Sequence, residues 1–420
     1  MTVELTTLPS GLRVVTHRMD AVETVSLGAW VEAGTRYEAA SVNGVSHLLE
    51  HMAFKGTARR SAQAIAEEIE AVGGSLNAYT SRESTAYHAT VLKEDVALAV
   101  DIIADILQHP AFDEAELARE RHVVLQEIGE TNDMPEELVF DRFQEVAYPD
   151  QPMGRTVLGP PEIVAAMPRE TLVDYMARHY SAPRMVIGAA GRLDHDAVVK
   201  MVEREFDALA AGGAPAPEPA RYAGGDTREA RALEQMHFVL GLDGMGYHDP
   251  DYYAASVASM ALGGGMSSRL FQEIRERRGL AYSIYSFLSP HADSGMFAVA
   301  AGTGAEDAAE LAGVLCDELS RAADGMEEAE LGRARAQLRA GIVMSLESTS
   351  SRAEQLARQV MVYDRPMEIA DITARIDAVT AEDVSRSIRR WLASKPTVAA
   401  IGPLGGLPGY EDLAAALRAA

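Results

Sequence analysis

The chain has 420 residues, of which 47% are hydrophobic and 24% charged, a composition typical of a folded globular protein. Its 63 acidic residues outnumber its 38 basic residues and give a formal net charge of −25, which opposes binding to nucleic acid and favours basic peptides through long-range attraction. No apolar run approaches the length of a membrane span, so we expect no membrane partner.

The N-terminal segment and the cysteine content indicate a compartment. Residues 1–11 lack the basic region and apolar core of a secretory signal, and they do not look like an Arg-rich mitochondrial transit peptide. The single cysteine, Cys316, excludes an intrachain disulfide and agrees with a reducing environment. We therefore expect a cytoplasmic protein of a bacterium.

The first motif with chemical content is His47-Leu48-Leu49-Glu50-His51. Residues four apart lie one above the other on a helix, so His47 and His51 can face one ion. Glu50 projects toward the same side and can reach a water held by that ion. A surface helix can carry the same pattern by chance, and a catalytic zinc needs a third protein ligand.

The segment 73–89 follows a helix predicted over 61–72 and begins with a glycine pair. Small, polar and aromatic residues alternate after it, which predicts a hairpin or an edge strand. Asn77 and Ala78 lie in this strand. A purely structural strand explains any single residue of the segment equally well.

A helix predicted over 113–128 offers the missing carboxylate, because it contains neither Gly nor Pro and is rich in helix formers. Glu120 and Glu127 are two turns apart and therefore share a face. A stripe of Leu117, Arg121, Val124 and Ile128 runs along the same helix, and Glu127 lies beside Val124 rather than opposite it. An ordinary solvated acidic face explains Glu114, Glu116 and Glu130 well, and spacing alone does not separate these from the other two glutamates.

In the C-terminal half, residues 268–283 predict a charged amphipathic helix that ends at Gly279 and leads into a strand. Arg275 and Tyr282 are seven positions apart in this segment. The charged residues Arg269, Arg277 and Arg278 are interpreted as surface charges.

The chain also contains an internal repeat. Residues 112–119 are echoed by residues 326–333 at an offset of 214, and residues 168–175 resemble residues 380–387. When the two copies are aligned at the offset of 214, Glu120 corresponds to Ala334 and Glu127 corresponds to Gly341. The second copy therefore keeps the helix but lacks the two carboxylates. Duplication with one active copy is the simplest account.

A segment rich in Pro and Gly separates the two copies and predicts a linker. We therefore expect an N-terminal domain over 1–210, a linker over 211–226 and a C-terminal domain over 227–420. Helices predicted over 61–72 and 94–108 alternate with strands, which argues for α+β layers. The predicted strands cover 25–31, 186–190, 237–242 and 297–301.

The histidine pair followed by Glu127, 127 − 51 = 76 positions after His51, resembles the pitrilysin or insulinase family of inverted zincin metallopeptidases. The surrounding segment Asn43–Thr57 is similar to that of processing-peptidase β subunits and their bacterial relatives. The resemblance covers nearly the whole chain.

The resemblance assigns roles to single residues. It implies that His47, His51 and Glu127 bind Zn²⁺, that Glu50 is the general base, and that Glu120 is a nearby carboxylate supporting the site. It also implies that Arg275 and Tyr282 bind substrate carbonyls and the developing oxyanion. Asn77 and Ala78 would lie in a strand that accepts the substrate as an added strand.

For the whole chain, the resemblance implies two homologous α+β domains related by a pseudo-twofold, each a mainly antiparallel sheet packed with helices. The first would bind zinc and the second would supply Arg275 and Tyr282. The implied activity is that of a zinc-dependent endopeptidase acting on peptides or unfolded segments inside a closed chamber. Since such chambers use four domains, a homodimer is expected, with Arg275 and Tyr282 acting on their own chain or on the partner.

Two alternatives remain open from the sequence. The family includes core proteins of respiratory complexes that keep the fold as a scaffold without catalysis, and it includes active subunits that require an unlike partner. An intact set of motif residues argues against the scaffold. The sequence does not identify the natural substrate or the preferred cleavage site.

Overall fold

The computed structural model describes residues 3–213 and 215–418. It contains two compact units, each assembled from three separate stretches of chain. The first unit comprises Met1–Gly129, Arg155–Glu218 and Met344–Met367, and the second comprises Glu130–Gly154, Pro219–Val343 and Glu368–Ala420.

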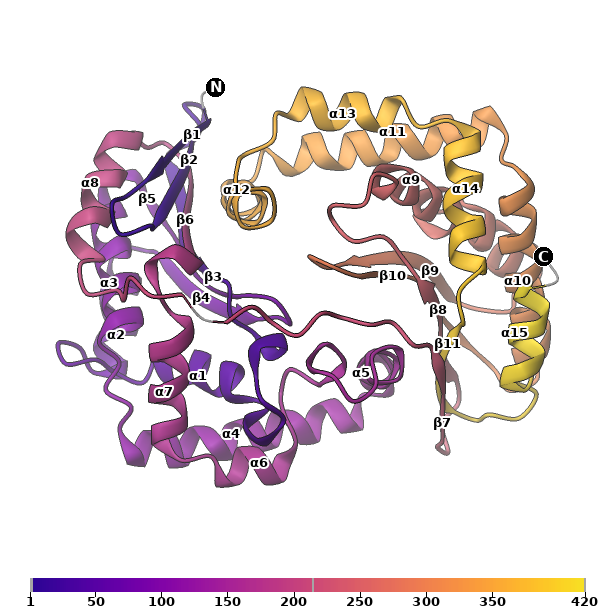
Figure 1. Cartoon of the computed structure of the whole chain (residues 1–420), viewed down its shortest axis with the longest axis horizontal. Helices are drawn as coiled ribbons and strands as arrows, with labels where there is room; N and C mark the ends of the chain where they lie inside the picture. The colour runs from indigo at the N-terminus through magenta and orange to yellow at the C-terminus, as the bar shows by residue number, and fades with distance from the viewer. Residues whose placement is uncertain (1–2, 214, 419–420) are drawn as a thin grey trace. The chain divides into compact units, whose positions relative to one another are not determined.

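A six-stranded mixed sheet forms the centre of the first unit. Its strand order is β1-β2-β6-β3-β5-β4, and only the neighbours β2 and β6 run parallel (Figure 1). The strands are β1 (Val3–Thr7), β2 (Arg13–Arg18), β3 (Thr24–Val31), β4 (Ser75–Thr80), β5 (Thr85–Leu92) and β6 (Met185–Gly191). The order leaves β4 at an edge of the sheet, as the alternation over 73–89 predicted.

Most helices of the first unit bury their apolar faces in one core. The helices of this unit are α1 (Val45–Ala53), α2 (Ala62–Ala71), α3 (Val96–Gln108), α4 (Glu114–Asp133, whose last residues belong to the second unit), α6 (Pro161–Ala166), α7 (Arg169–His179), α8 (His195–Glu205) and α12 (Thr349–Tyr363). Helix α12 buries its apolar face in a separate cluster on the sheet. The helix predicted over 61–72 is confirmed as α2. Ser61 is its N-cap, and the Ser61 side chain accepts a hydrogen bond from Ala64 N–H.

The second unit repeats this topology with a five-stranded sheet. Its strand order is β7-β11-β8-β10-β9, and only β7 and β11 run parallel. The strands are β7 (Gly225–Ala230), β8 (Met236–Asp243), β9 (Ser283–Pro290), β10 (Gly295–Thr303) and β11 (Thr397–Gly402). The helices are α5 (Pro135–Ala147), α9 (Tyr252–Gly263), α10 (Ala308–Asp324), α11 (Glu328–Ser345, whose last two residues belong to the first unit), α13 (Ile369–Asp377), α14 (Ala381–Leu392) and α15 (Tyr410–Arg418).

The two predicted repeats coincide with equivalent helices. Helix α4 begins at residue 114 and α11 at residue 328, and 328 − 114 = 214, the offset found in the sequence. Helices α7 and α14 begin at residues 169 and 381, and 381 − 169 = 212. Equivalent strand orders and equivalent helix starts support two homologous α+β domains.

Each sheet is covered on one face by a helix from the other half of the chain. Helix α12 packs against β2, β3 and β6 in the first unit (Figure 1). Leu356 and Val360 of this helix share a buried cluster with Val15 and Trp30 of the sheet. Helix α5 packs in the same way on β7, β8 and β11 in the second unit. The two compact units therefore do not coincide with the N-terminal and C-terminal halves of the sequence. The predicted domains 1–210 and 227–420, joined by a linker over 211–226, describe the two homologous copies and stay a prediction. Strand β7 already begins at Gly225, and Ala214 lies outside the described residues.

Two elements differ from their predicted form. The helix expected over 94–108 begins only at Val96, after a 3₁₀ turn over Lys93–Asp95. The helix expected in 268–283 has π-helical hydrogen bonding over Phe271–Arg277. Within the described part of the chain, no helix combines the length and the apolar character needed to cross a membrane.

Candidate metal centre

Helix α1 directs the apolar and the polar side chains of the histidine motif to different sides. Leu48 and Leu49 are fully buried in the core of the first unit, whereas His47, Glu50 and His51 are only partly buried. The helix starts at Gly44, whose φ of +96° places it in the left-handed region. A Cβ there would lie 2.7 Å from the carbonyl oxygen of Leu158, so this start accepts only glycine.

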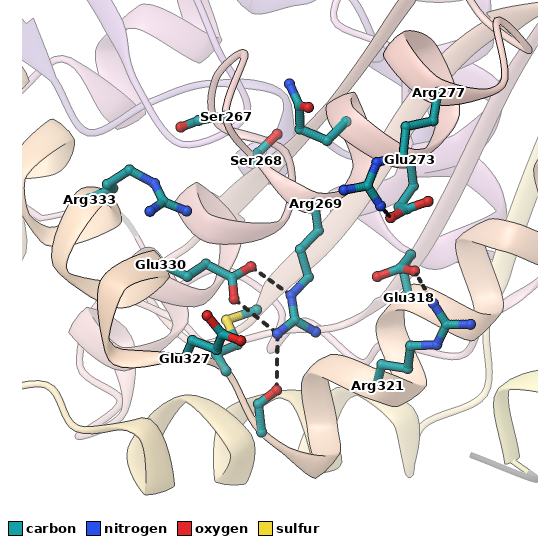
Figure 2. A pocket seen from close by; sticks show the side chains of 13 residues that line it. Ser267, Ser268, Arg269, Glu273, Arg277, Glu318, Arg321, Glu327, Glu330 and Arg333 are labelled. Carbon is teal, nitrogen blue, oxygen red and sulfur yellow. Dashed lines mark hydrogen bonds and ion pairs between the residues drawn. The ribbon is translucent and has the colours of Figure 1, made fainter.

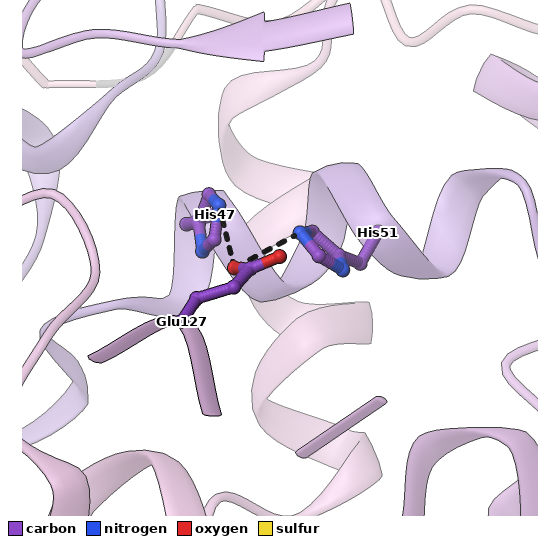
Figure 3. A group of neighbouring side chains, drawn as sticks. All are labelled: His47, His51 and Glu127. Atoms are coloured by element: carbon purple, nitrogen blue, oxygen red, sulfur yellow. Dashed lines mark ion pairs between the residues drawn. The ribbon is translucent and has the colours of Figure 1, made fainter. Parts of the chain in front are cut away.

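Three of the predicted side chains meet at one point. The candidate ligand atoms of His47, His51 and Glu127 all lie within 4.8 Å of one another, and Figure 3 shows the carboxylate of Glu127 between the two rings. Its Oε2 lies 3.7 Å from Nε2 of His47 and 3.6 Å from Nε2 of His51. Glu127 comes from α4, so folding brings together residues that are 76 positions apart.

These distances suit a metal ion better than direct hydrogen bonds. A zinc ion with ligand bonds of 2.0–2.2 Å at tetrahedral angles separates an imidazole nitrogen from a carboxylate oxygen by about 3.4 Å. The two observed separations exceed the limit for a good hydrogen bond and lie within a few tenths of an ångström of that value. Two imidazoles and one carboxylate also form the three-ligand set that leaves one position for water.

The imidazole of His51 is fixed by a carboxylate on its other side. Its Nδ1 lies 3.0 Å from Oε2 of Glu120, and the second oxygen of Glu120 lies 2.8 Å from Nζ of Lys55. Glu120 is buried, so this ion pair is shielded from solvent. An Nδ1–H donated to Glu120 leaves Nε2 with the lone pair that a metal requires.

His47 is held differently. Burial, followed by the neighbouring His51, lowers the pKa of His47 to about 4, which keeps its imidazole neutral and able to bind metal at neutral pH. Its Nδ1 is buried and has no hydrogen-bond partner among the described residues. The orientation of His47 therefore depends on packing and on helix α1 itself.

Glu50 lies beside this cluster without belonging to it. Its Oε2 accepts a hydrogen bond of 2.6 Å from the Thr80 hydroxyl at the end of β4. Burial raises the pKa of the Glu50 carboxyl, while the Thr80 hydrogen bond opposes that rise. A carboxylate whose pKa is raised toward neutrality is better suited to accept and return a proton.

Asn77 and Ala78 lie on β4, the edge strand that also carries Thr80. Among the described strands, β4 pairs with β5 alone, with Asn77 opposite His88 and Ala78 opposite Tyr87, so its other edge is not paired with a strand. The Asn77 side chain accepts a hydrogen bond of 2.9 Å from the Ala78 N–H. Their contact with substrate stays a prediction.

Arg275 and Tyr282 lie together in the second unit. The Arg275 guanidinium carbon lies 4.9 Å from the centroid of the Tyr282 ring and 4.6 Å from that of Phe271. Gly279, with φ of +69°, ends the helix between them, as predicted. Tyr282 is 79% exposed, so its hydroxyl is accessible to a ligand. Because the two residues belong to a different unit from the histidines, their role at the metal stays a prediction.

A charged pocket of about 680 Å³ in the second unit corrects one interpretation (Figure 2). Arg269 is not a free surface charge there. Its guanidinium donates to both oxygens of Glu330, at 2.6 and 2.9 Å, and to the carbonyl oxygen of Gly325. Four acidic and four arginine side chains line the pocket, so their charges balance. The ion pair between Arg269 and Glu330 connects the segment before the π-helix to α11.

Sequence reasoning missed two polar partners of the site, Thr80 and Lys55. Lys55 is four residues after His51, a helical spacing that could have suggested a shared partner. Thr80 lies in the segment already singled out as a strand, but nothing local in the sequence connects it to Glu50.

Comparison with protein-family models gives two adjacent matches. A model described as insulinase (peptidase family M16) matches residues 13–161. A second, described as the peptidase M16 inactive domain, matches residues 166–338. The first contains all the candidate metal ligands, and the second contains Arg275 and Tyr282.

Full-length relatives are similar over almost the whole chain. A Mycobacterium tuberculosis protein named an uncharacterized zinc protease is 43% identical over 407 residues, which cover 95% of this chain and 93% of the relative. A Streptomyces coelicolor protein with the same kind of name is 39% identical over 413 residues, covering 96% and 90%. A probable mitochondrial-processing peptidase β subunit of Arabidopsis thaliana is 38% identical over 422 residues, covering 97% and 80%.

A solved structure supports the fold. The crystal structure of a peptidase M16 inactive domain from Pseudomonas fluorescens matches with a TM-score of 0.90 and 23% identity, covering 97% of this chain and all of that one. At this identity the similarity concerns the fold alone.

Proposed function

The chain belongs to the insulinase family of peptidases, family M16, and we propose that it is a zinc-dependent endopeptidase. The observation that carries the proposal is the convergence of His47, His51 and Glu127 within 4.8 Å, with Glu50 close enough to interact electrostatically with His51 and Glu127. Relatives named zinc proteases support the choice of metal.

His47, His51 and Glu127 would hold the zinc ion, and Glu50 would handle the proton. When bound, zinc lowers the pKa of a coordinated water to about 7 and polarises the scissile carbonyl. The Glu50 carboxylate would take the proton from the attacking water and deliver it to the leaving amine. The Thr80 hydroxyl would keep one oxygen of Glu50 in place, so the other stays directed at the water.

Arg275 and Tyr282 would supply donors for substrate carbonyls and for the negative charge that develops on the carbonyl oxygen. A guanidinium and a phenol suit this role because both donate hydrogen bonds without taking the proton that Glu50 moves. Their stacking within 4.9 Å supports a joint role. Strand β4, with Asn77 and Ala78, would bind the substrate backbone as an added strand.

We further propose a homodimer in a bacterial cytoplasm that acts on peptides or unfolded segments in a closed chamber. The formal charge of −25 would favour basic peptides as substrates. Both the zinc ligands and the Arg275–Tyr282 pair occur in this one chain, so two identical chains would provide every residue that the reaction needs.

Zinc content and cleavage of a quenched basic peptide test the proposal directly when the wild-type chain is compared with Glu50→Gln. We expect about one zinc per chain in both proteins, and cleavage by the wild type alone. A wild-type chain that binds no zinc would contradict the proposal. Zinc binding without cleavage would instead indicate a scaffold or a subunit that needs an unlike partner.

A further inference from the structure

Backbone N–H groups at the start of α1 donate hydrogen bonds to a buried carboxylate, Glu38, which lies outside the histidine motif. Glu38 lies between two 3₁₀ turns, Thr35–Tyr37 and Ala40–Val42, and is only 3% exposed. Its Oε2 accepts hydrogen bonds from Asn43 Nδ2 and Gly44 N–H, and its Oε1 accepts one from Ser46 N–H, each 2.8 Å long.

These contacts favour the carboxylate form of Glu38. Burial raises the pKa of its carboxyl, and the hydrogen bonds from Asn43, Ser46 and Gly44 oppose that rise. All three groups are N–H donors directed at the two oxygens, and only a carboxylate accepts on both oxygens without a proton of its own. Among the residues that the structure describes, no cation forms an ion pair with this carboxylate; Arg155 donates instead to the Glu38 backbone carbonyl, at 2.7 Å. The negative charge is therefore compensated mainly by N–H groups at the start of the helix.

The Glu38 carboxylate lies where it can stabilise the N-terminus of α1. The first backbone N–H groups of a helix lack partners within the helix, and together they carry a partial positive charge. The N-cap of α1 is Gly44, which has no side chain to accept from them. Glu38 takes over this function from outside the helix, and its formal charge offsets the positive end.

The same turn carries a candidate zinc ligand. Ser46, whose N–H binds Glu38, directly precedes His47, and the Ser46 hydroxyl donates to the Tyr175 hydroxyl at 2.9 Å. A divalent cation near the positive end of a helix is disfavoured, and a buried anion at that end reduces this cost. Among the described residues, none forms a hydrogen bond with Nδ1 of His47, so the position of His47 depends on this turn.

We propose that Glu38 is a positioning residue of the metal centre: its carboxylate fixes the first turn of α1, which carries His47, and offsets the positive end of the helix next to the cation. This rests on the proposed zinc function. Glu38 contributes no metal ligand, and its effect reaches the ion through Ser46 and His47.

The variant Glu38→Gln tests the proposal, because it keeps the size of the side chain but removes the charge and turns one acceptor into a donor facing an N–H. The zinc dissociation constant is measured by competition with a chelator, on protein shown to be folded by circular dichroism. We expect zinc affinity to fall about 10-fold, the lower end of the range for residues that support metal ligands.

The matched control is Glu318→Gln. Glu318 is a similarly buried carboxylate, 5% exposed, but it lies in the second unit, where Arg321 pairs with it. This control is expected to lose stability without losing zinc affinity. A folded Glu38→Gln variant that binds zinc as tightly as the wild type would overturn the proposal.

A milder variant covers the case in which Glu38→Gln does not fold. Asn43→Ala removes one of the three donors and keeps the charge, so it should weaken zinc binding less than tenfold but measurably. If Asn43→Ala then binds zinc as the wild type does, the proposal is wrong. A wild-type chain without zinc would count against the proposed function instead, so the two failures are distinguishable.

Discussion

The two candidate imidazole ligands differ in whether a hydrogen-bond partner holds the ring. Removing the partner of His51 should therefore lower zinc affinity. His51 has Glu120 at its Nδ1, whereas the Nδ1 of His47 has no partner in the described part of the chain. Glu120→Gln should lower zinc affinity by about 10- to 100-fold, because the amide supports the imidazole less strongly than a carboxylate. Glu127→Gln should lower it further, since a ligand is lost.

The control for both variants is Glu130→Gln, on the same helix and exposed. Zinc retained after dialysis against a weak chelator measures the effect. Equal zinc content in Glu127→Gln and Glu130→Gln would exclude Glu127 as a ligand.

Substitution of Thr80 should lower the turnover rate without changing zinc binding, because Thr80 contacts Glu50, which is not a candidate metal ligand. Its hydroxyl donates to Glu50 at 2.6 Å, and a hydrogen bond to a charged group is worth about 1.5–3 kcal/mol. Thr80→Val should therefore lower kcat by about 10- to 100-fold with KM and zinc content little changed. Thr80→Ser keeps the hydroxyl and should restore most of the rate. If valine and serine variants have the same kcat, the hydroxyl does not position Glu50.

At the scale of single residues, the sequence and its family resemblance point to the candidate ligands and to the supporting Glu120, but not to the other polar groups that hold α1 and Glu50. Helical spacing places His47, Glu50 and His51 on one face without knowledge of the fold, and family resemblance selected Glu127. Thr80 and Glu38 were not found, because they reach α1 from other segments through side-chain hydrogen bonds. Such contacts depend on tertiary packing, which has no periodic signature in one sequence.

Among the elements, α12 is joined to the first sheet by a contact that predicts a pH dependence. Arg352 on α12 donates from Nε to Nδ1 of His17 on β2, at 3.0 Å, and both side chains are buried. Burial, followed by the charge of Arg352, lowers the pKa of His17 to about 4. The unfolded chain, with a histidine pKa near 6.5, then binds more protons between these values, so stability is lost as pH falls below about 6.5.

The size of this effect follows from the two pKa values. For His17 alone, the free energy of unfolding should fall by about 2 kcal/mol between pH 7 and pH 5. His17→Gln should show a smaller fall, because the glutamine oxygen can accept from Arg352 at either pH. Denaturant unfolding at both pH values, with a chelator present so that metal release does not contribute, measures the difference. An unchanged pH dependence in His17→Gln would contradict this contribution.

The elements themselves were largely predictable, and their exceptions have local causes. The strands over 25–31 and 237–242 and the helix over 61–72 have clear periodicity and clear boundaries, and each is found in the structure. The π-helical turns over Phe271–Arg277 were not predicted, because their side-chain pattern differs little from that of an α-helix. Insertions of this kind frequently accompany functional sites, and this one carries Arg275.

For the whole molecule, the exchange of α5 and α12 predicts that neither linear half is independent. Residues 1–210 alone would lack α12 and would expose the sheet face formed by Val15, Trp30 and Val186. An exposed apolar face of this kind favours aggregation. We expect the 1–210 fragment to be poorly soluble, and coexpression with a 211–420 fragment, which supplies α12, to restore it. A soluble, folded 1–210 fragment would show that α12 is dispensable.

A homodimer makes a second prediction at this scale, because Arg275 and Tyr282 can serve the zinc site of their own chain or that of the partner. Glu50→Gln and Arg275→Ala should each be inactive alone. If the site is shared between chains, mixing the two inactive proteins allows heterodimers in which one composite site has both Glu50 and Arg275 intact. Random exchange would then restore up to about one quarter of the wild-type activity, since half of the dimers are mixed and each has one complete site. No recovery after verified subunit exchange would place Arg275 at the zinc site of its own chain, where a mixed dimer contains no complete site.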